Sequence, residues 1–160
     1  QIMKYLTITY PDINNGPGFR ATLWIAGCSH HCPGCHNQHT WNYNQGTEFT
    51  SKGLKDEITE IFKHDYISGL TLSGGDPLDQ DVDSLHELAD FIKWFKTTYP
   101  DKTIWLYTGF MLDEIKSYYG KYIINLCDYI VDGRYDEKLR DTSLEFRGSS
   151  NQRIIKMHKD

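Results

Sequence analysis

The sequence has neither an excess of positive charge nor a long apolar run. Its 160 residues carry 17 Lys and Arg against 22 Asp and Glu, which gives a formal net charge of -5. Proteins that bind nucleic acid rely mainly on Lys and Arg to neutralise phosphates, so nucleic acid is disfavoured as a partner. No apolar stretch approaches the roughly 20 residues that cross a bilayer, and no basic and apolar leader is present. We therefore expect a cytoplasmic protein without a membrane partner.

Low-complexity segments and internal repeats are also absent. A chain of 160 residues suits one domain and can bury a sizeable hydrophobic core. We expect a single domain that spans residues 1–160. Gln1 and Ile2 precede Met3 and are candidates for residues added ahead of the natural start.

Cysteine is scarce, and its distribution is uneven. Three of the four cysteines, Cys28, Cys32 and Cys35, fall within the segment GCSHHCPGCHN at residues 27–37. A disulfide framework in a small secreted protein spreads an even number of cysteines along the chain, whereas a tight cluster indicates metal or redox chemistry. Cys127 stands apart in an apolar stretch, where we expect it to be a small buried hydrophobic residue.

Strand and helix patterns alternate along the chain, which is typical of parallel βαβ units. The carboxyl ends of such strands share one edge of the sheet, so the loops that follow them should meet there. Eight βα units need more than 160 residues, so we expect an α/β fold built as an open partial (β/α) barrel of parallel strands. The expected strands are 22–26, 68–73, 103–107 and 128–131, with 153–157 as a closing strand, and the expected helices are 50–63, 82–98 and 112–119.

Three cysteine thiols on one short loop could belong to either of two kinds of metal site. A structural zinc ion takes four nitrogen or sulfur ligands, and His30, His31, His36 or His39 could supply the fourth. An iron–sulfur cluster normally has four cysteine ligands, and three would leave one iron open to a small molecule. The single loop favours the cluster, because zinc sites usually take paired cysteines from separated segments.

The spacing of Cys28, Cys32 and Cys35 resembles the cluster motif of the radical SAM superfamily. Asn15-Gly16-Pro17-Gly18-Phe19-Arg20 resembles the GPGxR segment of the glycyl-radical-enzyme activases, and Gly74-Gly75-Asp76-Pro77 resembles the GGEP segment, with Asp in place of the commoner Glu. The segments 105–109, 131–135 and 146–153 are similar, in order and spacing, to the branch that activates the anaerobic ribonucleoside-triphosphate reductase.

This resemblance implies a radical SAM enzyme that activates its partner. A [4Fe–4S] cluster on the three cysteines would bind S-adenosylmethionine (SAM), and reductive cleavage would yield a 5′-deoxyadenosyl radical. That radical would form a glycyl radical on the reductase, with a flavodoxin-like or other low-potential protein as the electron donor. The segment from Asp132 to Arg147 is a candidate gate over the site. The implied SAM-binding residues are Gly34, Cys35 and His36 near the adenine, Ser73, Gly74, Gly75 and Asp76 near the amino group, and Thr108 and Asn151.

One position of the cysteine loop departs from this branch, and other hypotheses stay open. His36 occupies a position where the branch usually has Tyr. Gly34 precedes the third cysteine, where many radical SAM proteins have an aromatic residue and this branch prefers glycine. An activase of another glycyl radical enzyme and a modified-base synthase would share the three-cysteine loop. A zinc or iron–sulfur module without enzymatic activity is the third alternative.

Overall fold

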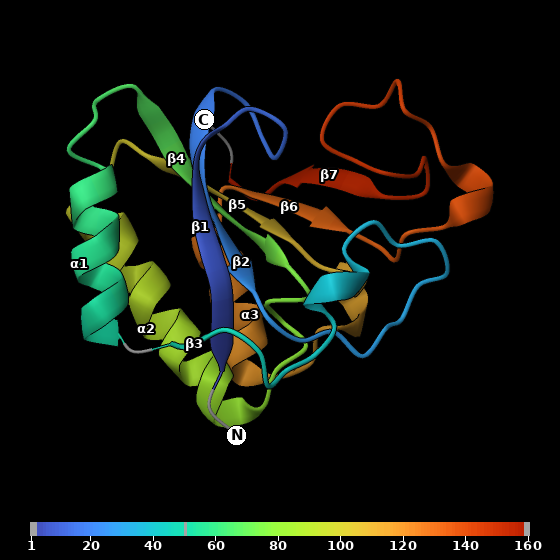
Figure 1. Ribbon diagram of the computed structural model, residues 1–160, viewed down its shortest axis with the longest axis horizontal. Coiled ribbons are helices and arrows are strands. Elements are labelled where there is room, and N and C mark those ends of the chain that lie inside the picture. Colours follow the sequence, from blue (N-terminus) through green and yellow to red (C-terminus); the bar gives the residue numbers. More distant parts are fainter. Residues whose placement is uncertain (1–2, 50, 159–160) are drawn as a thin grey trace.

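A single mixed β-sheet forms the centre of the molecule, and three α-helices cover one of its faces (Figure 1). The computed structural model describes residues 3–49 and 51–158, so Gln1, Ile2, Thr50, Lys159 and Asp160 lie outside it. The seven strands are arranged in the order β3-β1-β2-β4-β5-β6-β7. They are β1 (Lys4–Asp12), β2 (Phe19–Ile25), β3 (Thr47–Glu48), β4 (Ile67–Gly74), β5 (Thr103–Tyr107), β6 (Tyr129–Asp132) and β7 (Arg153–Lys156). The helices are α1 (Ser51–Ile61), α2 (Val82–Thr98) and α3 (Tyr118–Leu126), with short 3₁₀ turns at Gln38–Thr40, Leu112–Glu114 and Glu137–Leu139.

The expected open partial barrel of parallel strands is wrong. Only β2, β4, β5 and β6 run parallel to one another, while β1, β3 and β7 are antiparallel to the strands beside them. The reason lies in the connections. Segment 13–18 turns β1 directly back into β2, and β6 reaches β7 through residues 133–152 without an α-helix. Strands joined without a helical crossover pair antiparallel, so the parallel centre acquires antiparallel flanks.

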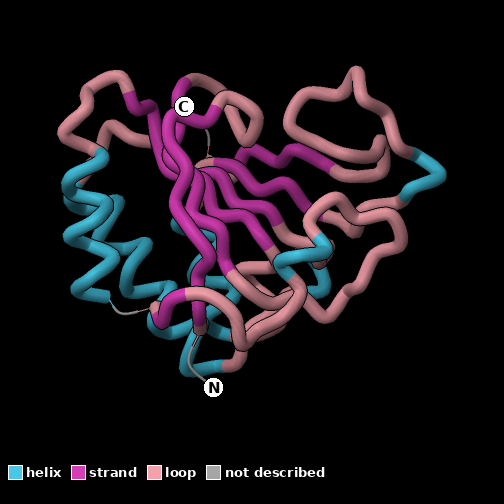
Figure 2. Tube along the Cα trace, in the orientation of Figure 1, coloured by secondary structure: helices cyan, strands magenta, loops and turns pink. Residues whose placement is uncertain are grey.

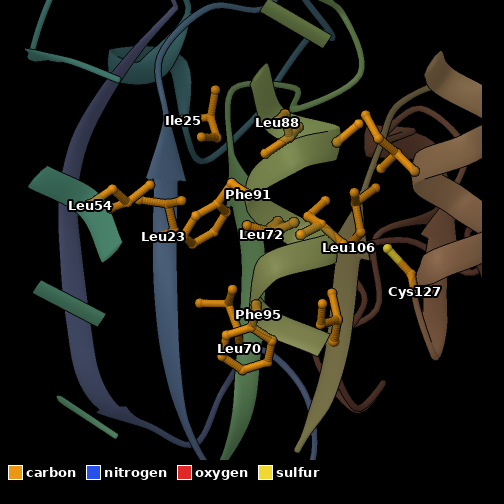
Figure 3. Packing of buried hydrophobic residues seen from close by; sticks show 14 of the residues in the cluster. Leu23, Ile25, Leu54, Leu70, Leu72, Leu88, Phe91, Phe95, Leu106 and Cys127 are labelled. Atoms are coloured by element: carbon orange, nitrogen blue, oxygen red, sulfur yellow. The ribbon is translucent and has the colours of Figure 1, made fainter. Parts of the chain in front are cut away.

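The hydrophobic core lies between the helices and one face of the sheet. Leu23 and Ile25 of β2 and Leu70 and Leu72 of β4 point toward α2 and are fully buried. Phe91 of α2 lies beside Leu23 and Leu72, and Phe95 lies beside Leu70 (Figure 3). Because successive side chains of a strand point to opposite faces, the residues between these leucines and isoleucines face the other way. The prediction that Cys127 is a small buried hydrophobic residue is confirmed, since it is fully buried in the same core.

The face of the sheet opposite the α-helices is polar and aromatic. Arg20 and Thr22 of β2 and Thr71 of β4 are buried there, and Trp24 and Tyr107 lie nearer the carboxyl ends of β2 and β5. The prediction that the loops after the parallel strands share one edge is confirmed: β2, β4, β5 and β6 end together, and their long loops gather at that edge (Figure 2). This edge positions the candidate site.

Candidate metal centre

The cysteine loop begins where β2 ends, and backbone hydrogen bonds fix its two ends. The Gly27 N–H donates to the carbonyl of Thr40 at 2.7 Å, and the Cys28 N–H donates to the carbonyl of Trp41 at 3.2 Å. Within the loop, the Cys35 N–H donates to the carbonyl of Cys32 at 3.1 Å. The loop therefore closes on itself, and all three cysteines are half-buried.

The loop borders a cavity of about 670 Å³ at the carboxyl edge of the sheet. Most of the residues that the sequence singled out line this cavity, although they come from three different loops. Gly34 and Asn151 are not among the lining residues; an added Cβ at Gly34 would meet the carboxylate of Glu137, and the Asn151 amide donates to the carbonyl of Arg134 at 2.8 Å. The expected residues that line the cavity are Cys28, Cys32, Cys35, His36, Ser73, Gly74, Gly75, Asp76 and Thr108.

Each cysteine sulfur is faced by backbone N–H groups. Burial raises the pKa of Cys28 to about 11, and the N–H groups of His30 and His31 oppose this rise. Burial also raises the pKa of Cys32, opposed by the Tyr135 backbone, and the Asn37 N–H donates to the Cys35 sulfur at 3.4 Å. Hydrogen bonds of this kind stabilise thiolates and tune iron–sulfur clusters. The three sulfurs therefore suit a metal group that displaces their protons.

The spacing of the donor atoms shows whether the three cysteines surround one ion. One group of three potential ligand atoms lies within 4.8 Å of one another, from Cys28, His30 and Asp79. No such group in the described part of the chain contains two cysteines. Sulfurs that share one zinc ion, each about 2.3 Å from it, would lie within this distance. The three cysteine sulfurs are therefore not gathered around a single ion in the described structure.

Asp76 joins the loops that follow three strands. Its Oδ2 accepts hydrogen bonds from the Gly109 N–H at 2.9 Å and the Thr108 hydroxyl at 3.0 Å, and it lies 2.7 Å from Nε2 of His30. Its Oδ1 accepts from the Leu78 N–H at 2.9 Å. The carboxylate is 1% exposed. The contact with Asp76 raises the pKa of His30, against the opposing effect of burial. Asp76 therefore connects the cysteine loop to the ends of β4 and β5.

The two glycines before Asp76 allow β2 and β4 to end in close contact. A Cβ at Gly74 would lie 2.3 Å from the carbonyl oxygen of Ile25, and a Cβ at Gly75 would lie 2.3 Å from that of Gly27. Gly74 also has φ +109°, a conformation that favours glycine. These glycines are thus required by the close approach of the end of β2 and the start of the cysteine loop.

Several lining residues were not among the expected cluster ligands and SAM contacts. Tyr107 lies at the end of β5, in the segment 105–109, and its hydroxyl donates to the carbonyl of Phe146 at 2.7 Å, which holds the loop before β7 at the cavity. Tyr135, in the segment 131–135, lies beside His36, with ring centroids 5.5 Å apart. Other lining residues belong to the segments similar to the family, to the candidate gate or to the candidate ligands, and these are Asn15, His30, Gly109, Gly133, Leu144, Glu145, Phe146, Arg147, Gly148 and Gln152. The lining residues that the sequence did not single out are Ile13, Asn14, Trp24 and Asn37.

A three-cysteine loop at the carboxyl edge of parallel strands defines a class of iron–sulfur protein. A family model described as a 4Fe-4S single cluster domain matches residues 14–155, which include the three cysteines and every parallel strand. The family thus carries one 4Fe-4S cluster. No described helix combines the length and apolar character that crossing a membrane requires.

Curated relatives narrow this class further. An anaerobic ribonucleoside-triphosphate reductase-activating protein of Enterobacteria phage T4 is 40% identical over 152 residues, which cover 95% of this chain and 93% of the relative. The protein of the same name from Escherichia coli K12 is 41% identical over 146 residues, which cover 89% of this chain and 92% of the relative. The one from Vibrio cholerae is 40% identical over 148 residues, which cover 91% of this chain and 93% of the relative. The chain belongs to the family of anaerobic ribonucleoside-triphosphate reductase-activating proteins.

Proposed function

We propose that this protein is a radical SAM enzyme that activates an anaerobic ribonucleoside-triphosphate reductase. The observation that carries the proposal is the convergence of three half-buried cysteines and the Ser73–Asp76 segment on one cavity, in a chain about 40% identical to proteins named for this activity. A cluster on Cys28, Cys32 and Cys35, reduced by a flavodoxin-like or other low-potential donor, would supply the electron that splits SAM into methionine and a 5′-deoxyadenosyl radical.

Different residues around the cavity hold different parts of SAM. Ser73, Gly74 and Gly75 bring the backbone at the end of β4 to the cavity wall, where carbonyl groups can accept from an ammonium group. The Asp76 carboxylate already contacts four partners, so its part is to hold this wall in place beside Thr108. His36 is exposed beside Tyr135, which suits an adenine at the rim of the cavity next to Cys35.

The substrate of the radical is a glycine in the partner protein. The α-helices cover only one face of the sheet (Figure 1). The cavity lies at the carboxyl edge of the sheet and is lined by Trp24 and Tyr107, which belong to the other face. A glycine loop has no side chain and can bring its Cα deep into a narrow site. Hydrogen transfer from that Cα leaves a radical that the flanking amides stabilise, so the partner retains it. The loop at 144–148, fixed through Tyr107, forms part of the wall that this peptide must pass.

The test is anaerobic reconstitution with iron and sulfide, followed by dithionite, SAM and the reductase. We expect a doublet electron paramagnetic resonance signal from the glycyl radical and release of 5′-deoxyadenosine. Cys32→Ala should abolish both, because one cluster ligand is lost. Cys127→Ala is the matched control, since this thiol is fully buried in the core away from the loop, and it should retain both.

Three outcomes would contradict the proposal. Activation by the Cys32→Ala protein would refute the ligand assignment. Release of 5′-deoxyadenosine that requires a small molecule and no protein partner would instead support a modified-base synthase. A colourless protein that holds zinc after oxygen-free purification would point to a module without this enzymatic activity.

A further inference from the structure

A second carboxylate, that of Asp79, lies against the cysteine loop at the Cys28 corner. Its Oδ2 accepts hydrogen bonds from the backbone N–H of Ser29 at 2.7 Å and from the Ser29 hydroxyl at 2.5 Å. One of its oxygens lies within 4.8 Å of the Cys28 sulfur. The Tyr43 hydroxyl donates to the Asp79 backbone carbonyl at 3.0 Å and so fixes the segment from the other side. The geometry therefore holds a charged group beside a cluster ligand.

The charge at this corner is one-sided. A carboxylate oxygen of Asp79 lies within 4.8 Å of the Cys28 sulfur and of a ring nitrogen of His30. An oxygen of Asp76 lies 2.7 Å from Nε2 of His30. Two carboxylates therefore share one imidazole at this corner. Hydrogen bonds from Ser29 lower the pKa of Asp79 despite the opposing effect of its partial burial. Asp79 is thus an anion at neutral pH.

The positive charge near the loop comes from Arg134. Its guanidinium forms two hydrogen bonds with Glu114, at 3.0 and 3.3 Å, so this charge is already shared with an acid. At Cys28 the carboxylates of Asp76 and Asp79 lie beside the single imidazole of His30, so negative charge is in excess there.

The Ser29 contacts strengthen this asymmetry. A backbone N–H that points at a cluster sulfur stabilises the more negative, reduced state. The Ser29 N–H, next to Cys28 in the chain, donates to Asp79 instead of to a sulfur. Asp79 thus adds a negative charge beside the loop and also occupies the Ser29 N–H, which cannot then donate to a sulfur.

We propose that Asp79 is a positioning residue that keeps the reduction potential of the bound cluster low through its negative charge. One electron from a low-potential donor makes the cluster more negative, and a nearby anion disfavours that state. The cluster is then a stronger one-electron reductant for the sulfonium group of SAM. This inference rests on the cluster of the proposed function and not on the partner or on SAM, so it can be tested without either.

The experiment is a redox titration of anaerobically reconstituted protein, monitored by visible absorbance and electron paramagnetic resonance, with no SAM and no reductase. Asp79→Asn keeps an acceptor for Ser29 and removes the charge, so its midpoint potential should shift in the positive direction. Asp79→Glu should stay close to the parent protein. Asp83→Asn removes an exposed carboxylate from the first turn of α2 and controls for net charge. Iron content is compared first, so that only equally loaded variants enter the comparison.

The Ser29→Ala variant separates the effect of the Asp79 charge on the potential from the effect of the Ser29 contact on the loop geometry. It removes the hydroxyl contact but leaves the Asp79 charge, so its potential should move less than that of Asp79→Asn. The difference between the parent protein and Asp79→Asn should also shrink at high ionic strength, because Asp79 is half-exposed and salt screens it. An unchanged or more negative potential in Asp79→Asn overturns the proposal, as does an equal shift in Ser29→Ala. If Asp79→Asn lost reductase activation while the midpoint potential of its cluster stayed unchanged, this inference would be refuted and the proposed function would stand.

Discussion

At the scale of single residues, Arg20 is the least expected feature of the sheet. Its side chain is fully buried, and its hydrogen bonds in the described structure go to neutral oxygens. Burial lowers its pKa to about 10, so the guanidinium remains charged at neutral pH. It bonds to Thr71 and Thr103, and the Thr71 hydroxyl in turn donates to the carbonyl of Asn15 at 2.6 Å. Arg20 thus fixes the segment before β2, part of which lines the cavity.

Replacing Arg20 by Met should destabilise the protein by about 2–4 kcal/mol, because buried oxygens lose their donors while the apolar volume is kept. Urea unfolding should show a lower midpoint with an unchanged slope. Arg140→Met is the matched control, since Arg140 is exposed, and it should change the free energy of unfolding by no more than about 0.5 kcal/mol. An equal effect of the two substitutions would show that the buried network contributes nothing.

The sequence predicted which kinds of residue form the site, but it did not predict which of them contact one another. The cysteine spacing and the Gly-Gly-Asp segment were visible in the sequence, and the structure brings both to one cavity. Nothing in the sequence indicated that His30 lies 2.7 Å from Asp76, since they are 46 positions apart and belong to loops after different strands. Such a contact depends on how β2 and β4 pair. Arg20 was equally ambiguous, because a buried and a strand-flanking arginine look alike before the fold is known.

At the scale of elements, the buried strands and α1 and α2 followed their hydrophobic patterns. β1 was missed because it lies near the edge of the sheet, has mostly exposed or half-buried side chains and pairs with β2 through irregular register. The sequence pattern predicted the third helix too early in the chain, at 112–119, whereas α3 spans Tyr118–Leu126. The chain forms a 3₁₀ turn at Leu112–Glu114, and α3 starts after Ser117, whose side chain accepts from the Gly120 N–H. That serine was an available start signal.

The start of α2 makes a prediction about pH. Asp81 is its N-cap, and its carboxylate accepts from the Ser84 N–H at 2.9 Å, which lowers the pKa of Asp81. A pKa lowered by folding means that the stabilisation is complete above the unfolded value and is lost as pH falls through the folded one. Asp81→Ala should therefore lower the free energy of unfolding by about 1 kcal/mol at pH 7, and less below about pH 4.

Urea unfolding at several pH values measures this difference. Asp81→Asn is the control, because an asparagine side chain also caps helices but does not titrate in this range. Its stability relative to the parent protein should improve as the pH falls. A cost of Asp81→Ala that stays constant from pH 7 to pH 3 would exclude the charged cap as the cause.

At the scale of the whole molecule, stability and chemistry occupy different parts of the sheet. The core lies between the helices and one face (Figure 3), whereas the cysteines lie in the loop at the carboxyl edge. None of Cys28, Cys32 and Cys35 belongs to the buried core. The cysteine loop is held by backbone contacts at its ends and by the side chains of Asp76 and Asp79. The fold should therefore survive loss of the cluster, and only the loop should loosen.

The protein in which all three of these cysteines are changed to Ala tests this separation. Its far-ultraviolet circular dichroism should match that of the parent, because the helices and the sheet do not depend on the loop sulfurs. Hydrogen exchange should be faster at the amides of residues 27–37 and unchanged in β4 and β5, whose opening requires the core to separate. The cluster-loaded parent should unfold at a higher temperature than its cluster-free form, since a group that binds only the folded state stabilises it. Uniformly faster exchange, or a loss of helical signal, would mean that the cluster supports the sheet itself and that core and site are not separate.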